Sequence, residues 1–373
     1  MDRQGEPLNE TQESKQAERE EVVAAWIERP INRIRVQRCL SGKNLQFEKL
    51  LEALEVYQDK GMYEQYDRLV KAIIQLHEKR GDFIKALVLK IKSATYLYRY
   101  DWKHAKRLLA SVITSDLPVE YSDVIKARAY CSLALVARIR RKEKYKTNQL
   151  LEYLERSEHL LRFYDLPEDW AVLYLTYGCV WMDYMYMSNL PLDRRDVVRE
   201  KAMDYFRRAI YYSEQDHRAR VKMKIQIQAH FKVAMIHLGY CSTFAPAQEN
   251  HIPLKDIKEA ENHLDIILFK FGNTIPMAAR FLFMKTQSDL FYHKGQYQPA
   301  KDKAEDALEC ASRLGFNTEL KTLQERIDFC QKKLETVRDQ ILSVPQEIQA
   351  QGLRAEAAFK EAMEKGSVEV YHG

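Results

Sequence analysis

The chain has 373 residues, of which 46% are hydrophobic and 30% are charged, and its net charge is +5. This composition is too apolar for a disordered chain, and twelve Gly and ten Pro are too few for the many turns of an all-β fold. The six cysteines stand at least twenty residues apart, which excludes a zinc knuckle and a dithiol redox motif. Long helices with reduced, buried thiols are expected.

Residues 1–20 are polar and acidic, and they are predicted to form a disordered arm. Residues 21–43 are predicted to be a short helical lead-in that becomes basic. The stretch 29–47 contains Arg29, Arg33, Arg35, Arg38 and Lys43 and no acidic residue. Residues 1–28 carry eight acidic side chains against three basic ones, so the two stretches can neutralise each other. The N-terminus lacks the apolar core of a secretory signal, and we therefore expect a cytoplasmic protein.

A short pattern recurs at the breaks between the helical stretches that follow. A turn residue stands two positions before an aromatic residue, and in three of the four cases Ala comes three positions after the aromatic. The four cases begin at Gly61, Gly81, Tyr100 and Gly295. Such a turn lets two antiparallel helices approach, the aromatic residue packs between them, and Ala permits a close crossing with the next helix. The pattern predicts repeated helical hairpins.

These hairpins resemble the tetratricopeptide repeat, whose unit of about 34 residues has a small residue, an aromatic, Gly, Tyr and two Ala at fixed offsets. The segment 280–312 matches best, with consensus positions at Phe291, Gly295, Tyr297, Ala300 and Ala307. A second match has Leu89, Ser93, Tyr96, Trp102 and Ala105. A third match has Tyr174, Tyr177, Gly178, Trp181, Ala202, Phe206 and Ala209.

The resemblance implies an all-α fold, a right-handed superhelical solenoid of about six antiparallel helix pairs at residues 44–315 with a C-terminal capping helix. The pairs are predicted at residues 44–80, 82–115, 119–163, 167–213, 216–271 and 275–315. The middle units are longer than the repeat, so the register of the third and fifth units stays open. The most apolar stretch, 170–192, contains Asp183 and is predicted to be a buried helix of this solenoid instead of a membrane span.

Residues 316–344 are predicted to cap the stack. From Leu320 to Ile341, apolar residues recur at alternating spacings of three and four. This spacing fits a cap that packs on the last helix pair, and it also fits a coiled-coil seam. The cap is the preferred interpretation. Pro345 is predicted to start a separate segment, 345–373, with a C-terminal amphipathic helix and a flexible tail.

Catalytic and metal-binding motifs are not found in the sequence. It has no Gly-rich phosphate loop and no Gly-x-Ser-x-Gly elbow, and His77-Glu78 lacks the second His of a metalloprotease motif. His230 and His237 share a helix face, but two ligands on one helix seldom close a metal site, so both are predicted to be core histidines. We therefore expect no enzymatic activity, no metal and no cofactor.

Two functions fit the resemblance, and the first is a scaffold or adaptor. Such a protein binds a peptide or helix in a concave groove lined by the first helix of each pair. The predicted groove residues mix cations with aromatics, which favours an acidic protein partner; they are Lys90, Tyr98, Lys285, Asp289, Tyr292 and His293. The resemblance does not extend to the family's chaperone-tail clamp, because Ala94 stands where that clamp has Asn. We expect a monomer that does not bind membranes.

The second function is RNA binding, similar to that of the interferon-induced tetratricopeptide proteins. Its phosphate contacts would come from a basic cluster opposed only by Glu143, made of Arg138, Arg140, Arg141, Lys142, Lys144 and Lys146. The net charge of +5 over 373 residues is small for a nucleic-acid-binding protein, and the adaptor is therefore preferred.

Overall fold

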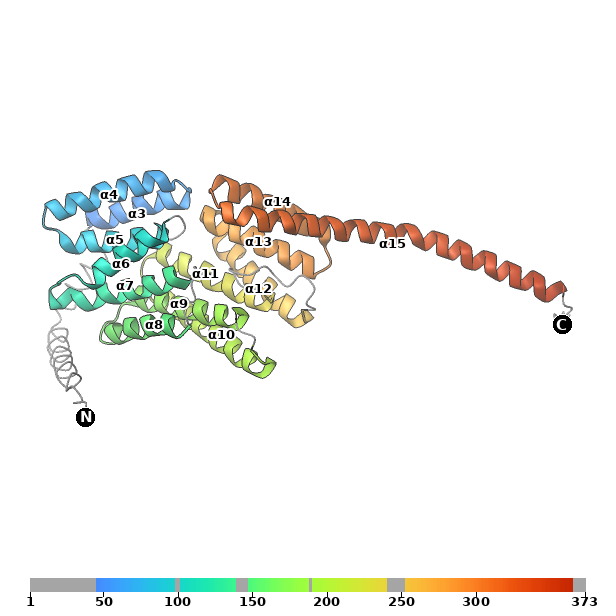
Figure 1. Ribbon diagram of the computed structural model, residues 1–373, viewed down its shortest axis with the longest axis horizontal. Coiled ribbons are helices and arrows are strands. Elements are labelled where there is room, and N and C mark those ends of the chain that lie inside the picture. The colour runs from blue at the N-terminus through green and yellow to red at the C-terminus, as the bar shows by residue number, and fades with distance from the viewer. Residues whose placement is uncertain (1–44, 98–100, 139–146, 188–189, 240–251, 365–373) are drawn as a thin grey trace, which may run out of the picture. The chain divides into compact units, whose positions relative to one another are not determined.

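The computed structural model describes residues 45–97, 101–138, 147–187, 190–239 and 252–364. Every regular element in these ranges is a helix (Figure 1), which confirms the predicted all-α class. The chain divides into two compact units, Met1–Thr286 and Gln287–Gly373. The boundary falls inside one helix, α13 (Met277–His293).

The described residues of the first unit form five helical hairpins followed by the start of α13. Their helices are α3 (Leu45–Asp59) and α4 (Tyr63–Lys79), α5 (Phe83–Leu97) and α6 (Trp102–Ile113), α7 (Val119–Arg138) and α8 (Thr147–Leu161), α9 (Pro167–Met187) and α10 (Leu192–Glu214), and α11 (Ala219–His237) and α12 (Leu254–Phe271). A 3-10 turn, Gly272–Thr274, follows α12. Each predicted range therefore contains two consecutive helices.

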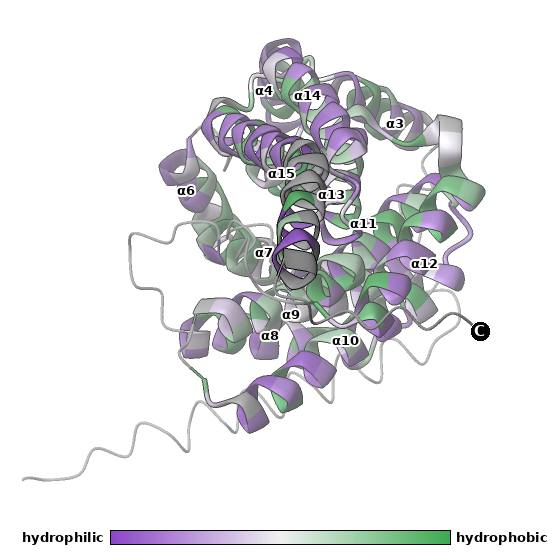
Figure 2. Ribbon diagram, turned by 90° about the vertical axis from the view of Figure 1, so that its right-hand side faces the viewer, coloured by the Kyte–Doolittle hydropathy of each residue, from purple (hydrophilic) through white to green (hydrophobic). Residues whose placement is uncertain are grey.

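Consecutive helices of this unit pack against each other, and the first helices of neighbouring hairpins also touch. From α5 onward, α5 packs on α7, α7 on α9, and α9 on α11. Small residues make these approaches possible, since Ala94, Ala127 and Ala171 are completely buried. The second helix of each hairpin packs on the first helix of the same hairpin; in Figure 2, the ribbon of α10 alternates between hydrophilic and hydrophobic residues, as in an amphipathic helix.

The predicted glycine turns are present and share one hydrogen-bond pattern. At Gly81, φ is +75°, the amide of Gly81 donates to Glu78, and the amide of Asp82 donates to His77. Gly295 has φ of +73° and repeats the pattern, with the amide of Gln296 donating to Phe291. This left-handed end of a helix is the Schellman motif, which favours glycine because a Cβ atom is strained there.

The second unit contains the end of α13, then α14 (Tyr297–Arg313) and α15 (Asn317–Glu364). Ala300 is completely buried, as predicted, and its carbonyl accepts a hydrogen bond from Ser288 Oγ at 2.7 Å. α15 packs on α14 through buried Leu323, Ile327 and Cys330. Beyond Leu334, every residue of α15 whose side chain is described is exposed.

The predicted break at Pro345 is not present, because α15 runs without interruption for 48 residues. A proline inside a helix removes one intrahelical hydrogen bond and tends to bend the helix. Here the surrounding sequence is rich in strong helix formers, including Gln, Glu and Ala, which favour continuation on both sides. The cap and the C-terminal amphipathic segment are therefore parts of one helix.

Gly178 of α9 lies directly against Phe206 of α10. A Cβ atom built on Gly178 would lie 2.7 to 2.9 Å from carbons of the Phe206 ring. Phe206 is completely buried, so the ring cannot move away without disturbing its other contacts. The sequence match at Gly178 and Phe206 thus corresponds to a direct packing contact between the two helices of one hairpin.

We predict that Gly178→Ala destabilises the protein by about 1 to 3 kcal/mol through overpacking, although Ala is favoured over Gly in helices by about 1 kcal/mol. Urea unfolding followed by circular dichroism measures the change. Adding Phe206→Leu to the same chain should recover part of the loss. The control is Gly352→Ala in α15. A Cβ atom added there would meet no other part of the protein within 4 Å, so this substitution should be neutral or stabilising. A Gly178→Ala protein as stable as the wild type would contradict the packing described.

Candidate functional site

A group of ion pairs joins helices at opposite ends of the first unit. Glu55 of α3 accepts hydrogen bonds from Lys92 of α5 at 3.0 Å and from Lys224 of α11 at 2.9 Å. Asp59, one turn further along α3, pairs with Arg220 of α11 and lies 3.4 Å from Lys224 Nζ. We name these five residues the α3–α11 clasp. They bring together segments that are more than 160 residues apart in the sequence.

A second ionic group, the Arg128 cluster, lies on α7, α9 and the turn before α11. Arg128 donates to both carboxylate oxygens of Asp169, at 2.5 and 2.8 Å. Arg218 donates to Glu168 at 2.6 Å and to Asp216 at 2.8 Å. Glu168 and Asp169 stand in the first turn of α9, where the helix dipole favours acidic residues. Asp216 also accepts the Arg218 backbone amide at 2.8 Å.

The two groups influence each other electrostatically. Burial alone would raise the pKa of Glu55, but the ammonium groups of Lys92 and Lys224 outweigh it and lower that pKa from 4.5 to about 2. The pKa of Glu168 is likewise lowered, since the positive charges of Arg218, Arg128 and Lys92 outweigh its burial. Lys92 therefore acts on both carboxylates, and the first helices α3, α5, α7, α9 and α11 meet in one region of paired charge.

The clasp and the cluster differ in access to solvent. The side chains of Lys92 and Arg220 are each 35% exposed, and that of Lys224 is 26% exposed. In the Arg128 cluster, the carboxylate of Asp169 is only 6% exposed. A buried bidentate pair of this kind fixes the packing of α7 against α9. The cations of the clasp are thus more exposed than Arg128 and Arg218 of the cluster, whose side chains are 17% and 23% exposed.

The residues predicted to line the groove are placed as follows in the first unit. Lys90 of α5 forms an ion pair with Glu78 of α4 at 2.7 Å. Lys285 of α13 is buried. Tyr98 lies outside the described residues. Lys92, two positions after Lys90, is 35% exposed and pairs with Glu55 of α3 instead.

Three predicted groove residues lie together in the second unit and face α15. Asp289 forms an ion pair with Arg326 of α15 at 2.6 Å. The Tyr292 ring lies 5.2 Å from that of Phe329 in α15, and His293 packs edge-on against Tyr292. Burial lowers the pKa of His293. Within this unit, Asp289 and Tyr292 of the predicted groove therefore contact α15.

Of the six residues in the predicted phosphate-binding cluster, the structure describes only Arg138. Arg138, at the end of α7, is buried and donates to Asp183 of α9 at 3.0 Å. The other five cations, Arg140, Arg141, Lys142, Lys144 and Lys146, lie outside the described residues. Asp183 belongs to the most apolar stretch of the sequence; of the helices that the structure describes, none is both long and apolar enough to cross a bilayer.

The histidines of α11 are buried, as predicted for core residues, and they meet a third histidine of α12. His230 Nδ1 lies 2.8 Å from His263 Nδ1, so one of these nitrogens carries a proton and the other accepts it. Burial lowers the pKa of both to about 4, and both are neutral at pH 7. His237 pairs with Asp256 at 2.7 Å. Among the described residues, no group of His, Cys, Asp and Glu is arranged to hold a metal ion.

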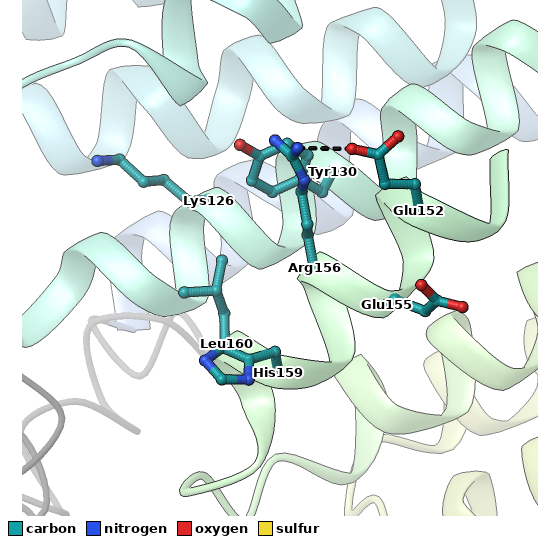
Figure 3. A pocket seen from close by; sticks show the side chains of 7 residues that line it. All are labelled: Lys126, Tyr130, Glu152, Glu155, Arg156, His159 and Leu160. Carbon is teal, nitrogen blue, oxygen red and sulfur yellow. Dashed lines mark hydrogen bonds and ion pairs between the residues drawn. The ribbon is translucent and has the colours of Figure 1, made fainter. Parts of the chain in front are cut away.

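A surface hollow of about 430 Å³ lies between α7 and α8 (Figure 3). Its lining consists of Lys126, Tyr130, Glu152, Glu155, Arg156, His159 and Leu160. Arg156 donates to Glu152 at 2.6 Å, and its guanidinium lies over the Tyr130 ring at 5.8 Å. Arg156 is therefore held by groups of the hollow itself, and cations and carboxylates are mixed around it. We assign no ligand to this hollow.

Comparison of the chain with protein-family models finds no match, and comparison with curated proteins finds none either.

The sequence analysis missed the α3–α11 clasp, although a signal for it is present. Glu55 and Asp59 are like charges four residues apart on α3, and Arg220 and Lys224 are like charges four residues apart on α11. Such pairs repel each other on an isolated helix and cost about 0.2 to 0.5 kcal/mol. One helix therefore carries a repelling acidic pair and the other a repelling basic pair. This combination indicates that the two pairs of side chains neutralise each other's charge in the folded protein.

We predict that Glu55 makes stability depend on pH. Its pKa is lower in the folded chain, so its contribution is fully present above pH 4.5 and is lost as the pH falls toward 2. The contribution is at most about 3 kcal/mol at neutral pH. The stability difference between wild type and Glu55→Gln should therefore be largest at pH 7 and shrink below pH 5, as measured by urea unfolding.

The matched control for this measurement is Glu64→Gln on α4, because Glu64 forms an exposed ion pair with Arg68. An exposed pair of this kind contributes little to stability, so the control should keep the wild-type dependence on pH. An equal pH dependence in the wild type and the Glu55→Gln protein would show that the clasp does not stabilise the fold.

Proposed function

We propose that this chain is a divergent tetratricopeptide-like repeat protein that acts as a non-enzymatic adaptor in the cytoplasm. In this proposal the six hairpins, including α13 with α14, form a right-handed superhelical solenoid that α15 caps. The support is the repeated Schellman turn at the hairpins, together with the side-by-side packing of α5, α7, α9 and α11. Repeats that stack their first helices in a row form an extended surface suited to binding a peptide or helix.

The observation that carries the binding assignment is the accessible positive charge of the clasp. Lys92, Arg220 and Lys224 come from two first helices and remain partly exposed. Their side chains can donate to carboxylates in more than one geometry, because each ammonium has three donors and the guanidinium has five. Partly exposed ion pairs are individually weak, about 0.2 to 1 kcal/mol. Several together give selectivity and fast association with an acidic segment.

We predict that neutralising two clasp cations reduces partner binding. The wild-type full chain and a Lys92→Gln/Lys224→Gln double variant are immobilised, and proteins captured from a lysate are identified by mass spectrometry. Partners of the proposed surface should be retained by the wild type and lost by the double variant. Circular dichroism and thermal unfolding establish that the variant is folded before its binding is compared.

The matched control carries Lys71→Gln and Lys321→Gln, which remove two charges from exposed ion pairs outside the clasp. This control should retain the wild-type partners. Equal capture by all three proteins would mean that binding occurs elsewhere and would refute the surface assignment. A bound fraction that disappears after ribonuclease treatment, with affinity falling steeply as salt rises, would replace the adaptor by the RNA-binding function.

We also predict a monomer, because the packed part of the α15 seam faces α14. Leu323, Ile327 and Cys330 are buried, whereas Val337 is 38% exposed. Light scattering of the full chain should report a mass near 44.0 kDa that does not change with concentration. A dimer at micromolar concentration that Val337→Glu dissociates, without loss of helicity, would instead show that the outer part of α15 is an interface between copies.

A further inference from the structure

Helix α3 presents an acidic segment to the cations of the clasp. Glu55 and Asp59 are one helical turn apart and meet Lys92, Arg220 and Lys224 on two other helices. Seen from α5 and α11, these carboxylates have the arrangement that an acidic helix of another protein would offer. α3 therefore has the charge and the spacing of a ligand for the surface proposed above.

The buried apolar residues of α3 pack with residues of α4 and α5. A core cluster that includes Phe47 and Leu54 joins α3 to α4 and α5 and contains no described residue of α11; its buried members are Phe47, Leu54, Tyr66, Val70, Ile74, Ala86, Val88 and Leu89. A separate core cluster joins α5 to α11. The ion pairs of the clasp thus join α3 to α11, while the apolar core holds α3 on α4 and α5.

Ion pairs of this kind can be exchanged. The carboxylates of Glu55 and Asp59 are 17% and 21% exposed, and the cations are more exposed than either. Water and salt therefore reach the clasp and weaken it. A competing carboxylate pair can replace that of α3 at the cations while the α3–α4 core stays intact.

We propose that α3 is an internal ligand that occupies the partner site, and that the partner is a helix with two carboxylates one turn apart. Binding of this partner displaces Glu55 and Asp59 from Lys92, Arg220 and Lys224. The inference rests on the proposed adaptor function and specifies its ligand class and its regulation. Partner affinity is set by competition with α3, since a site filled by an internal group is available only in the fraction of molecules in which that group is released.

The test uses a fluorescent synthetic peptide that copies residues 45–59, and fluorescence anisotropy with the full-length protein. The Glu55→Gln/Asp59→Asn protein, whose internal ligand lacks its charges, should bind the peptide about tenfold more tightly than the wild type does, because several ion pairs become available. A control peptide with Gln and Asn at the two acidic positions should bind both proteins equally weakly. Adding Lys92→Gln and Lys224→Gln to the variant should abolish the gain.

A control protein with Glu64→Gln and Asp67→Asn loses two acidic residues of α4 whose ion pairs lie outside the clasp, and it should bind as the wild type does. If the double variant loses helicity, the Asp59→Asn protein is used instead. Its affinity for the peptide should be about threefold higher than that of the wild type, because fewer ion pairs become available. Equal peptide affinity in the wild type and the folded variants overturns the internal-ligand proposal, as does equal binding of the acidic and control peptides.

The two proposals fail in different ways. In one outcome, capture of lysate partners depends on Lys92 and Lys224, but the peptide affinity of the Glu55→Gln/Asp59→Asn protein equals that of the wild type. This outcome would support the adaptor function and refute the internal ligand. A tenfold gain in peptide affinity without any lysate partner that depends on these lysines would support the internal ligand and refute the adaptor function.

Discussion

Close approach of antiparallel helices is the constraint on which the rest of this structure depends. Each hairpin has an apolar side that it cannot bury alone, so it must pack on the next hairpin. Close packing requires small residues at the crossings, and Gly178 under Phe206 and the buried Ala300 show how little room is left. Glycine turns such as Gly81 reverse the chain within a few residues. The row of first helices, and therefore every charge on it, is positioned by these contacts.

Charge on the first helices is balanced between helices more than within them. The acidic pair of α3 and the basic pair of α11 would each destabilise its own helix, and they neutralise each other across the unit. The Arg128 cluster is more buried and fixes α7 against α9. The clasp is partly hydrated, which makes it weaker and exchangeable. One charge pattern thus produces a structural group and a surface that a partner can reach.

The second unit shows why a groove cannot be assigned from repeat positions alone. Asp289 and Tyr292 occupy positions that the repeat resemblance assigns to a ligand, and both contact α15. These contacts hold the two side chains within the unit. In the first unit, Lys90 pairs with Glu78 of the neighbouring α4, whereas Lys92 pairs with Glu55 of α3. A shift of two residues turns a helix by more than half a turn and changes which partner a side chain meets.

The sequence by itself determined the all-α class, the ranges of the helix pairs and the buried positions at Ala300, His230 and His237. These features follow from local rules, since a glycine turn, an aromatic residue and a stripe of small residues act over a few turns of helix. Only the tertiary structure decided that Glu55 meets Lys224 and that Arg138 meets Asp183. It also decided that α15 continues through Pro345. Ion pairs between distant helices depend on the accumulated geometry of several hairpins, and no local pattern specifies that geometry.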